Sequence, residues 1–114
     1  MLQDNALWIA LAAAALVFFV TQRMGKVDPA EARRLVAEGA LLLDVRSVGE
    51  FAGGHLPGAV NVPVDQVAAR ADELAKKGKP VVVYCASGMR SGSAARTLKA
   101  KGLSVVDLGS MSRW

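Results

Sequence analysis

Three short apolar runs that alternate with helical patterns constrain the fold of this chain more than any other feature. The runs are ALLLDVR (40–46), PVVVYC (80–85) and SVVDL (104–108). Continuous apolar runs of this length are typical of strands buried on both faces of a sheet. Parallel neighbours need long crossover connections, so helices between such strands predict a parallel sheet. The sequence therefore predicts an α/β fold of three layers, with a central parallel sheet between helices.

Helical patterns cover three segments before and between these runs, namely residues 28–39, 64–78 and 91–102. Asp28 is suited to cap the first of these helices, because its side chain can accept a hydrogen bond from a free backbone N–H. The stretch at 49–63 is rich in glycine and proline and predicts turns at Gly53-Gly54 and Pro57-Gly58.

The first two dozen residues differ from the rest of the chain. Residues 5–22 carry no charged side chain, and as a helix they would span roughly 27 Å, close to the thickness of a bilayer core. We therefore expect residues 1–24 to form a membrane anchor helix and residues 25–114 to form one domain. A soluble amphipathic or buried helix is the alternative, because the many alanines lower the hydropathy of the segment.

The charges that flank this segment predict its orientation. A cleaved signal peptide carries positive charge before its apolar stretch and small residues after it. Here Asp4 precedes the stretch and FFVTQRM ends it. The positive residues follow instead, at Arg23, Lys26, Arg33 and Arg34. The positive-inside rule then predicts a single-pass membrane protein whose domain faces the cytoplasm.

Composition narrows the possible functions. Lys and Arg number 14 against 10 Asp and Glu, a net charge of +4, and 5% of the residues are aromatic. A nucleic-acid-binding surface would interleave basic and aromatic residues, and no segment does so; we expect no nucleic acid partner. A single cysteine excludes an internal disulfide. Any thiol chemistry of this chain must therefore use that one cysteine.

The cysteine, Cys85, stands where a predicted strand ends and a turn of small residues begins. Ligands of parallel α/β sheets bind at this edge. The following helix directs unpaired N–H groups and the positive end of its dipole at the turn, and Arg90 adds a positive charge. These features favour a nucleophilic thiolate. A buried, inert cysteine is the alternative, and the turn that follows fits it poorly.

Two stretches, LLLDVRSVGEFAGGHLPGAVNVP and VVVYCASGMRSGSAARTLKAKG, together resemble the rhodanese homology domain, a family of sulfurtransferases. The first is similar to the family's Asp-Val-Arg, Glu-Phe and Gly-His-Leu-Pro-Gly-Ala pattern, and the second to its active-site loop. The resemblance extends over residues 27–114. It implies an α/β fold with a central parallel sheet. It also implies that Cys85 accepts sulfane sulfur from thiosulfate or another persulfide and passes it to a thiol, or to cyanide in vitro, without a metal or organic cofactor.

The resemblance also assigns a substrate-binding loop. Its residues are Ala86, Ser87, Gly88, Met89 and Arg90. Sulfurtransferases of the family have six residues from cysteine to arginine, whereas the related cell-cycle phosphatases have seven and a wider cradle for phosphate. This chain has six, which makes a phosphatase or an arsenate reductase the less favoured alternative.

Four further residues are expected to support the loop. Asp44 and Arg46 end the first predicted strand, and Glu50 follows. We expect a charge network that positions the loop, with Arg90 as a candidate member; plain surface ion pairs are the alternative. Ser91 is expected to cap the third helix.

The only histidine, His55, invites the role of a general base. A thiolate that is already formed needs no base, and in the family's pattern this position is a structural turn. We therefore expect a structural role for His55.

Two positions depart from the family's pattern. The tail LGSMSRW has one glycine, Gly109, where the family often has a pair, so its last helix is expected to be missing or minimal. Met89 stands where a polar or basic residue is common, and an apolar loop tip suits a hydrophobic or protein-borne donor. The expected function is a membrane-anchored single-domain sulfurtransferase; the alternative is a non-turnover binding or redox-sensing module at the membrane.

Overall fold

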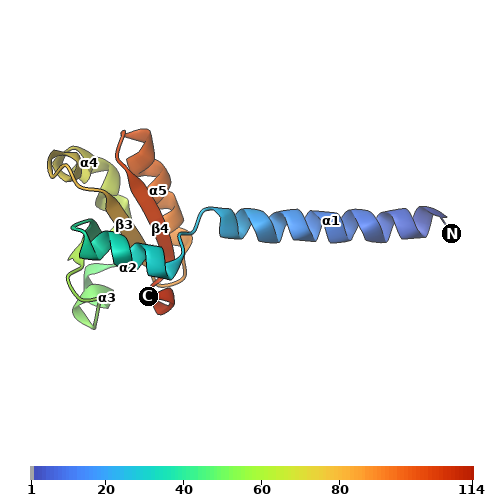
Figure 1. Cartoon of the computed structure of the whole chain (residues 1–114), viewed down its shortest axis with the longest axis horizontal. Helices are drawn as coiled ribbons and strands as arrows, with labels where there is room; N and C mark the ends of the chain where they lie inside the picture. The colour runs from blue at the N-terminus through green and yellow to red at the C-terminus, as the bar shows by residue number, and fades with distance from the viewer. Residues whose placement is uncertain (1) are drawn as a thin grey trace.

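A sheet of four parallel strands, in the order β2-β1-β3-β4, forms the centre of the domain (Figure 1). The computed structural model describes the backbone of residues 2–114 and the side chains of residues 5–17 and 25–114. The strands are β1 (Leu41–Asp44), β2 (Val60–Asn61), β3 (Val81–Cys85) and β4 (Val105–Ser110). The predicted α/β fold with a central parallel sheet is confirmed, and β2 adds a short edge strand that the sequence did not predict.

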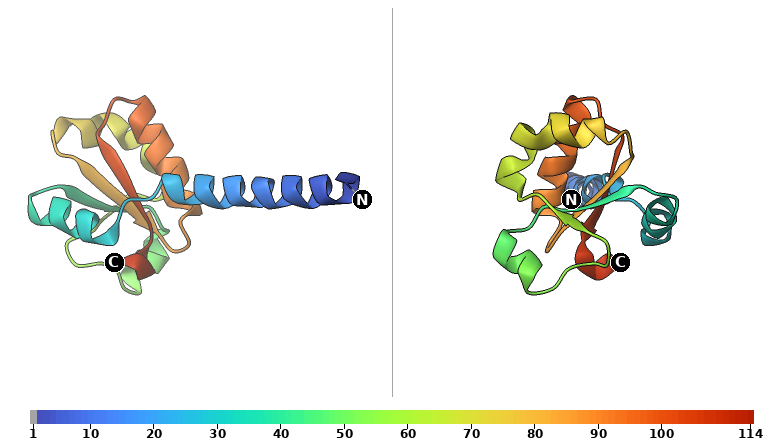
Figure 2. Two further views of the ribbon diagram at one scale, coloured as in Figure 1. Left: turned by 45° about the vertical axis from the view of Figure 1, so that its right-hand side comes forward. Right: turned by 90° about the vertical axis from the view of Figure 1, so that its left-hand side faces the viewer.

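Helices cover both faces of this sheet and give each face its own core. Helices α4 (Val67–Lys76) and α5 (Met89–Ala100) pack on one face, and α2 (Pro29–Ala37) packs on the other (Figure 2). Successive strand residues point to opposite faces, so Cys85 belongs to the core under α4 and α5, and Tyr84 to the core under α2. All five residues of β3 are buried, which gives the strand that carries the cysteine a rigid base.

The start of α5 differs from the prediction. The helix begins at Met89 rather than near Ser91, because Gly88 adopts a left-handed φ of 101° at the N-cap and turns the chain there. Ser91 therefore lies inside the first turn and is not the cap. By contrast, Asp28 caps α2 as predicted, since its side chain accepts a hydrogen bond from the N–H of Ala30.

A short helix, α3 (Val48–Ala52), occupies the segment before the predicted turns. Its cap is Ser47: the Ser47 hydroxyl accepts the N–H of Glu50 at 3.1 Å, and the Glu50 carboxylate accepts the N–H of Ser47 at 3.0 Å. This reciprocal capping box has a recognisable serine-to-glutamate spacing. The sequence could have predicted α3 from this spacing.

The end of the chain carries a single 3-10 turn, η2 (Met111–Arg113), directly after β4. Met111 and Trp114 pack against the core under α2. The structure thus agrees with the expectation of a minimal last helix.

Helix α1 (Leu2–Met24) projects away from the domain (Figure 1). A helix in this segment is as predicted. Within the described part of the chain, however, no helix combines the length and the apolar character needed to cross a membrane. The side chains at 18–24, which complete the predicted span, lie outside the described residues, and the spanning helix is not supported.

Candidate active site

The Cys85 sulfur lies at the carboxyl end of β3, within hydrogen-bonding distance of two backbone N–H groups. Gly88 donates to Sγ at an N···S distance of 3.0 Å and Ser91 at 3.3 Å. The Ser91 N–H is one of the donors left unpaired by the first turn of α5. Although Cys85 is fully buried, its sulfur therefore has polar partners that an inert core cysteine would lack.

These donors set the acidity of the thiol. Burial by itself would raise the pKa of Cys85. The backbone N–H groups of Ser91, Gly88 and Ser87 outweigh burial and hold the pKa below its ordinary value. A lower pKa enlarges the thiolate fraction at neutral pH, and the thiolate is the nucleophilic form.

The loop backbone is tied to its surroundings at several points. The Ser110 hydroxyl of β4 donates to the Ala86 carbonyl at 2.7 Å. The Ser91 hydroxyl donates to the Gly88 carbonyl at 3.1 Å. The loop that follows Cys85 is thus held by β4 on one side and by α5 on the other.

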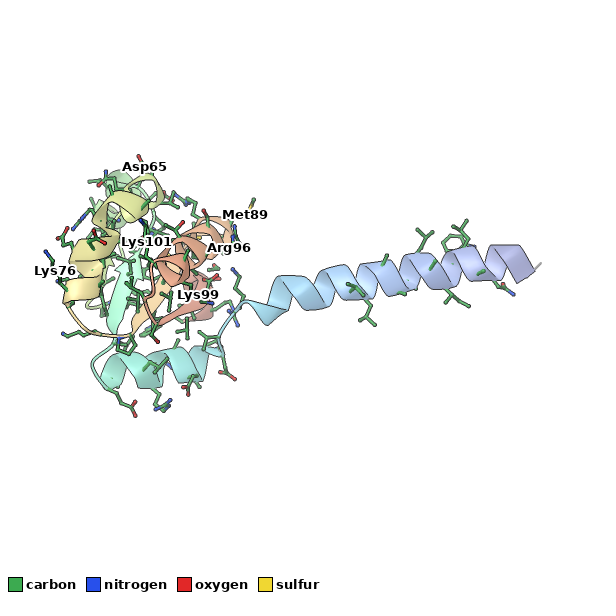
Figure 3. All side chains as sticks on the ribbon, turned by 90° about the horizontal axis from the view of Figure 1, so that it is seen from above. Asp65, Lys76, Met89, Arg96, Lys99 and Lys101 are labelled. Carbon is green, nitrogen blue, oxygen red and sulfur yellow. The ribbon has the colours of Figure 1, made fainter. Side chains whose placement is uncertain are left out.

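The tip of the loop faces solvent. Met89 is 82% exposed and projects from the end of α5 (Figure 3). Together with Ser87, Arg96 and Lys99 it lines a groove of about 440 Å³ on the flank of the loop. An apolar side chain therefore stands at the exposed tip of the loop.

Arg90 does not bond to the cysteine sulfur; it pairs with Glu50. Two N–H groups of its guanidinium donate to the two carboxylate oxygens of Glu50, at 2.6 and 3.0 Å. This pair raises the pKa of Arg90, and the charge of Cys85 acts on the guanidinium in the same direction through space. The ion pair ties α3 to the first turn of α5, so the predicted link between Glu50 and Arg90 exists.

The Glu50–Arg90 pair predicts an unusual titration. Hydrogen bonds from Arg90, and then from Ser47, lower the pKa of Glu50 to about 2. Because its pKa is lowered, the Glu50 carboxylate stabilises the fold at pH values above 4.5, the ordinary pKa of the group. This contribution is lost as the pH falls towards 2. A carbon-13 NMR titration of the Glu50 carboxyl should therefore have its midpoint near 2 in the wild type. Arg90→Leu should move it towards the ordinary value, and a wild-type midpoint near 4.5 would contradict this account.

Asp44 and Arg46 form a separate pair that is buried. The Arg46 Nη2 lies 2.8 Å from Asp44 Oδ2, with side-chain exposures of 8% and 0%. The same Nη2 donates to the Gly54 carbonyl at 2.7 Å, and the Asn61 amide donates to the carbonyls of both residues. These contacts hold the segment between α3 and β2 against the sheet. The pair therefore orders the chain beside the active loop and is not a plain surface ion pair.

His55 lies in the turn after α3, away from the sulfur's hydrogen-bond partners. Its Nδ1 lies 3.0 Å from the Phe51 carbonyl oxygen, and its ring stacks on the Phe51 ring with centroids 3.8 Å apart. These contacts are those of a turn-stabilising side chain.

One residue beside the loop was assigned no site role from the sequence. The ammonium group of Lys26 donates to the Gly88 carbonyl at 2.9 Å and to Asp107 Oδ2 at 2.6 Å. In the sequence, Lys26 stands out only as one of the positive charges after α1. No local spacing connects Lys26 with Gly88, because 62 positions separate them.

Comparison with known proteins identifies the family of this domain. The rhodanese-like domain family matches residues 28–114. This chain belongs to the rhodanese-like family. Its loop from Cys85 to Arg90 is six residues long.

Relatives within the rhodanese-like family include sulfurtransferases. A protein named thiosulfate sulfurtransferase GlpE, from Pseudomonas savastanoi pv. phaseolicola, is 37% identical over 83 residues, which cover 71% of this chain and 76% of the relative. The protein YqhL of Bacillus subtilis is 36% identical over 104 residues, covering 87% of this chain and 82% of the relative. The structure of the human single-domain sulfurtransferase TSTD1 has a TM-score of 0.66 at 31% identity and covers 79% of this chain and 94% of its own.

Proposed function

We propose that this rhodanese-like domain transfers sulfane sulfur through a persulfide on Cys85. The Cys85 thiolate attacks the outer sulfur of thiosulfate or the terminal sulfur of a persulfide donor. The S–S bond of the donor breaks, and the leaving group takes the bonding electron pair: sulfite leaves from thiosulfate, and the donor's thiolate leaves from a persulfide. A thiolate acceptor, or cyanide in vitro, then attacks the outer sulfur of the persulfide, and Cys85 departs as a thiolate. Both steps are displacements at sulfur, so the proposal includes no metal or organic cofactor.

A single observation carries this proposal: the sulfur of Cys85 accepts the N–H of Gly88, within the six-residue loop from Cys85 to Arg90, and the N–H of Ser91, directly after it. The loop residues Ala86, Ser87, Gly88, Met89 and Arg90 are proposed to surround the bound sulfur donor. Donors directed at one point stabilise a thiolate before the reaction, and the anionic outer sulfur of the persulfide after it.

Intact-protein mass spectrometry of the full chain tests the proposal. Incubation with thiosulfate should add one sulfur atom, and cyanide should remove it and yield thiocyanate. The same treatment of Cys85→Ser should add nothing. A folded wild-type protein that gains no sulfur from thiosulfate or from a polysulfide would overturn the proposal.

A sulfur carrier without multiple turnover is the second candidate. Cys85 is fully buried, which slows access of successive donors and acceptors. A relative in Bacillus subtilis named putative sulfur carrier protein YrkF is 41% identical over 69 residues, covering 60% of this chain and 37% of the relative. Steady-state kinetics separate the candidates: a carrier would load one sulfur per chain and release it slowly, whereas an enzyme would form many thiocyanate molecules per chain.

We further propose that α1 attaches the domain to a membrane, with the domain on the cytoplasmic side. Large apolar side chains of α1 are exposed: Leu7, Trp8, Ile9, Leu11, Leu16 and Val17. Basic residues follow them in the sequence, as the positive-inside rule requires. After cell fractionation the full chain should sediment with membranes, and deletion of residues 2–17 should release it. Recovery of the full chain in the soluble fraction would overturn attachment.

A further inference from the structure

The side chain of Lys26 connects the start of the domain with the active-site loop. Lys26 forms an isolated parallel bridge with Asp107 of β4, and the N–H of Val27 donates to the Asp107 carbonyl at 2.7 Å. These backbone contacts fix the origin of the Lys26 side chain. Its ammonium group then reaches the Gly88 carbonyl at 2.9 Å and Asp107 Oδ2 at 2.6 Å.

Three glycines leave the space that this side chain occupies. A Cβ added at Gly109 would stand 3.2 Å from Lys26 Cδ, closer than ordinary van der Waals contact. Added at Gly88 or Gly92, it would stand 3.7 or 3.5 Å from Lys26 Nζ. A side chain at Gly109 would press on the Lys26 side chain, and the φ of 85° at Gly109 also favours glycine.

The Asp107 carboxylate binds both the Lys26 ammonium group and the backbone of β4. Its Oδ1 accepts the N–H of Gly109 at 2.8 Å, while Oδ2 accepts from Lys26. The Asp107 side chain is 4% exposed and that of Lys26 is 24% exposed. A carboxylate this buried needs a charged partner, so Asp107 holds the ammonium group in place under the loop.

Gly88 links this contact to the sulfur site, because the same residue carries both groups. Its carbonyl accepts from Lys26 at 2.9 Å, from the Ser91 hydroxyl at 3.1 Å and from the N–H of Gly92 at 3.2 Å. Its N–H donates to the sulfur of Cys85 at 3.0 Å. A change in the backbone dihedral angles of Gly88 that moves its carbonyl would therefore also disturb the N–H that faces the sulfur.

We propose that Lys26 is a positioning residue of the sulfur-transfer site. It holds the Gly88 carbonyl on the outer side of the loop, so that the loop N–H groups stay directed at the sulfur of Cys85. The role of Lys26 in catalysis rests on the proposed function. The effect of Lys26 on the Cys85 thiol does not depend on any sulfur donor. Lys26 acts through the loop and does not touch the reacting atoms.

Alkylation of Cys85 by iodoacetamide, measured against pH in the full chain, tests the proposal. In Lys26→Met the pH midpoint should rise by about one unit, and the rate at neutral pH should fall about tenfold, because a hydrogen bond to the charged sulfur is weakened. Arg90, whose guanidinium interacts through space with the charges of Cys85 and Asp44, is not substituted in this variant. Lys76→Met removes an equal charge in the last turn of α4 and should leave the profile unaltered.

Lys26→Met also leaves Asp107 buried without its partner, which is expected to lower the melting temperature. Lys26→Met/Asp107→Asn removes both charges and should recover part of that loss. The midpoint should nevertheless stay raised in the double variant, and Lys26→Arg, which keeps a cationic donor, should lie between wild type and Lys26→Met. If the midpoint returns to the wild-type value together with the melting temperature, Lys26 has only a structural role and the proposal is wrong.

Different results would contradict sulfur transfer by Cys85 and the positioning role of Lys26. A wild type that gains sulfur from thiosulfate, with an unshifted midpoint in Lys26→Met, would contradict the role of Lys26 alone. A shifted midpoint in a protein that never gains sulfur would contradict sulfur transfer and keep Lys26 as a positioning residue of a reactive thiol.

Discussion

Cys85→Ser is expected to reduce thiocyanate formation from thiosulfate and cyanide by about a thousandfold or more. Serine is close to cysteine in size, and its oxygen can accept from the N–H groups of Gly88 and Ser91 that face the sulfur of Cys85. A serine hydroxyl is not ionised at neutral pH, and an oxygen atom cannot carry the sulfane sulfur as a persulfide. The chemistry should therefore disappear while the fold remains.

Steady-state thiocyanate formation in the full chain measures this effect, with circular dichroism and the melting temperature as controls for folding. The expected result is a wild-type spectrum and a melting temperature within a few degrees of wild type. Activity of Cys85→Ser comparable with that of the wild type would mean that the nucleophile lies elsewhere, and the assignment of Cys85 would be wrong.

Gly88→Ala is expected to lower kcat/KM for thiosulfate by about tenfold to a hundredfold. Gly88 has a φ of 101°, where an L-residue is strained by about 1–2 kcal/mol. Its added Cβ would meet no atom closer than the Gly109 Cα at 3.6 Å, so the cost comes from the backbone itself. The loop would relieve it by rotating at this residue, which moves the Gly88 N–H away from Sγ and its carbonyl away from Lys26.

Gly102→Ala is the matched control for this variant. Gly102 also has a left-handed φ, of 89°, and a Cβ added there would meet no atom within 4 Å beyond its chain neighbours. It lies beyond the other end of α5, far along the chain from Cys85. Both variants should lose similar stability in chemical denaturation, but only Gly88→Ala should lose activity and show a raised pH midpoint of Cys85 alkylation. Equal losses of activity would show that backbone strain acts through global stability alone.

Local patterns account for most of what could be predicted from this sequence. The apolar run that ends at Cys85 predicted β3, and the turn of small residues after it predicted a loop that leads into a helix. Donors directed at the sulfur follow from that strand-loop-helix order, because the first N–H groups of a helix have no partners within it. Helix α3 was overlooked although Ser47 and Glu50 have the spacing of a capping box, which is also a local signal.

Contacts between distant segments could not be predicted in the same way. Neither the pairing of Arg90 with Glu50 nor the burial of the Asp44–Arg46 pair follows from spacing. The sequence located these charges near one edge of a sheet, and the placement of α3 in the fold brings Glu50 to Arg90.

The sequence by itself determined the class of fold, the position of the thiol at the carboxyl end of a strand and the length of the loop, because each depends on residues close together in the chain. The tertiary structure alone decided which side chains hold that loop. Lys26 meets Gly88 and Asp107 across 62 and 81 positions, since β4 lies beside β3 and the start of the domain adds a bridge to β4. Hydrogen bonds and ion pairs act over a few ångströms, so their partners are set by the order of the strands in the sheet and not by the order of residues in the chain.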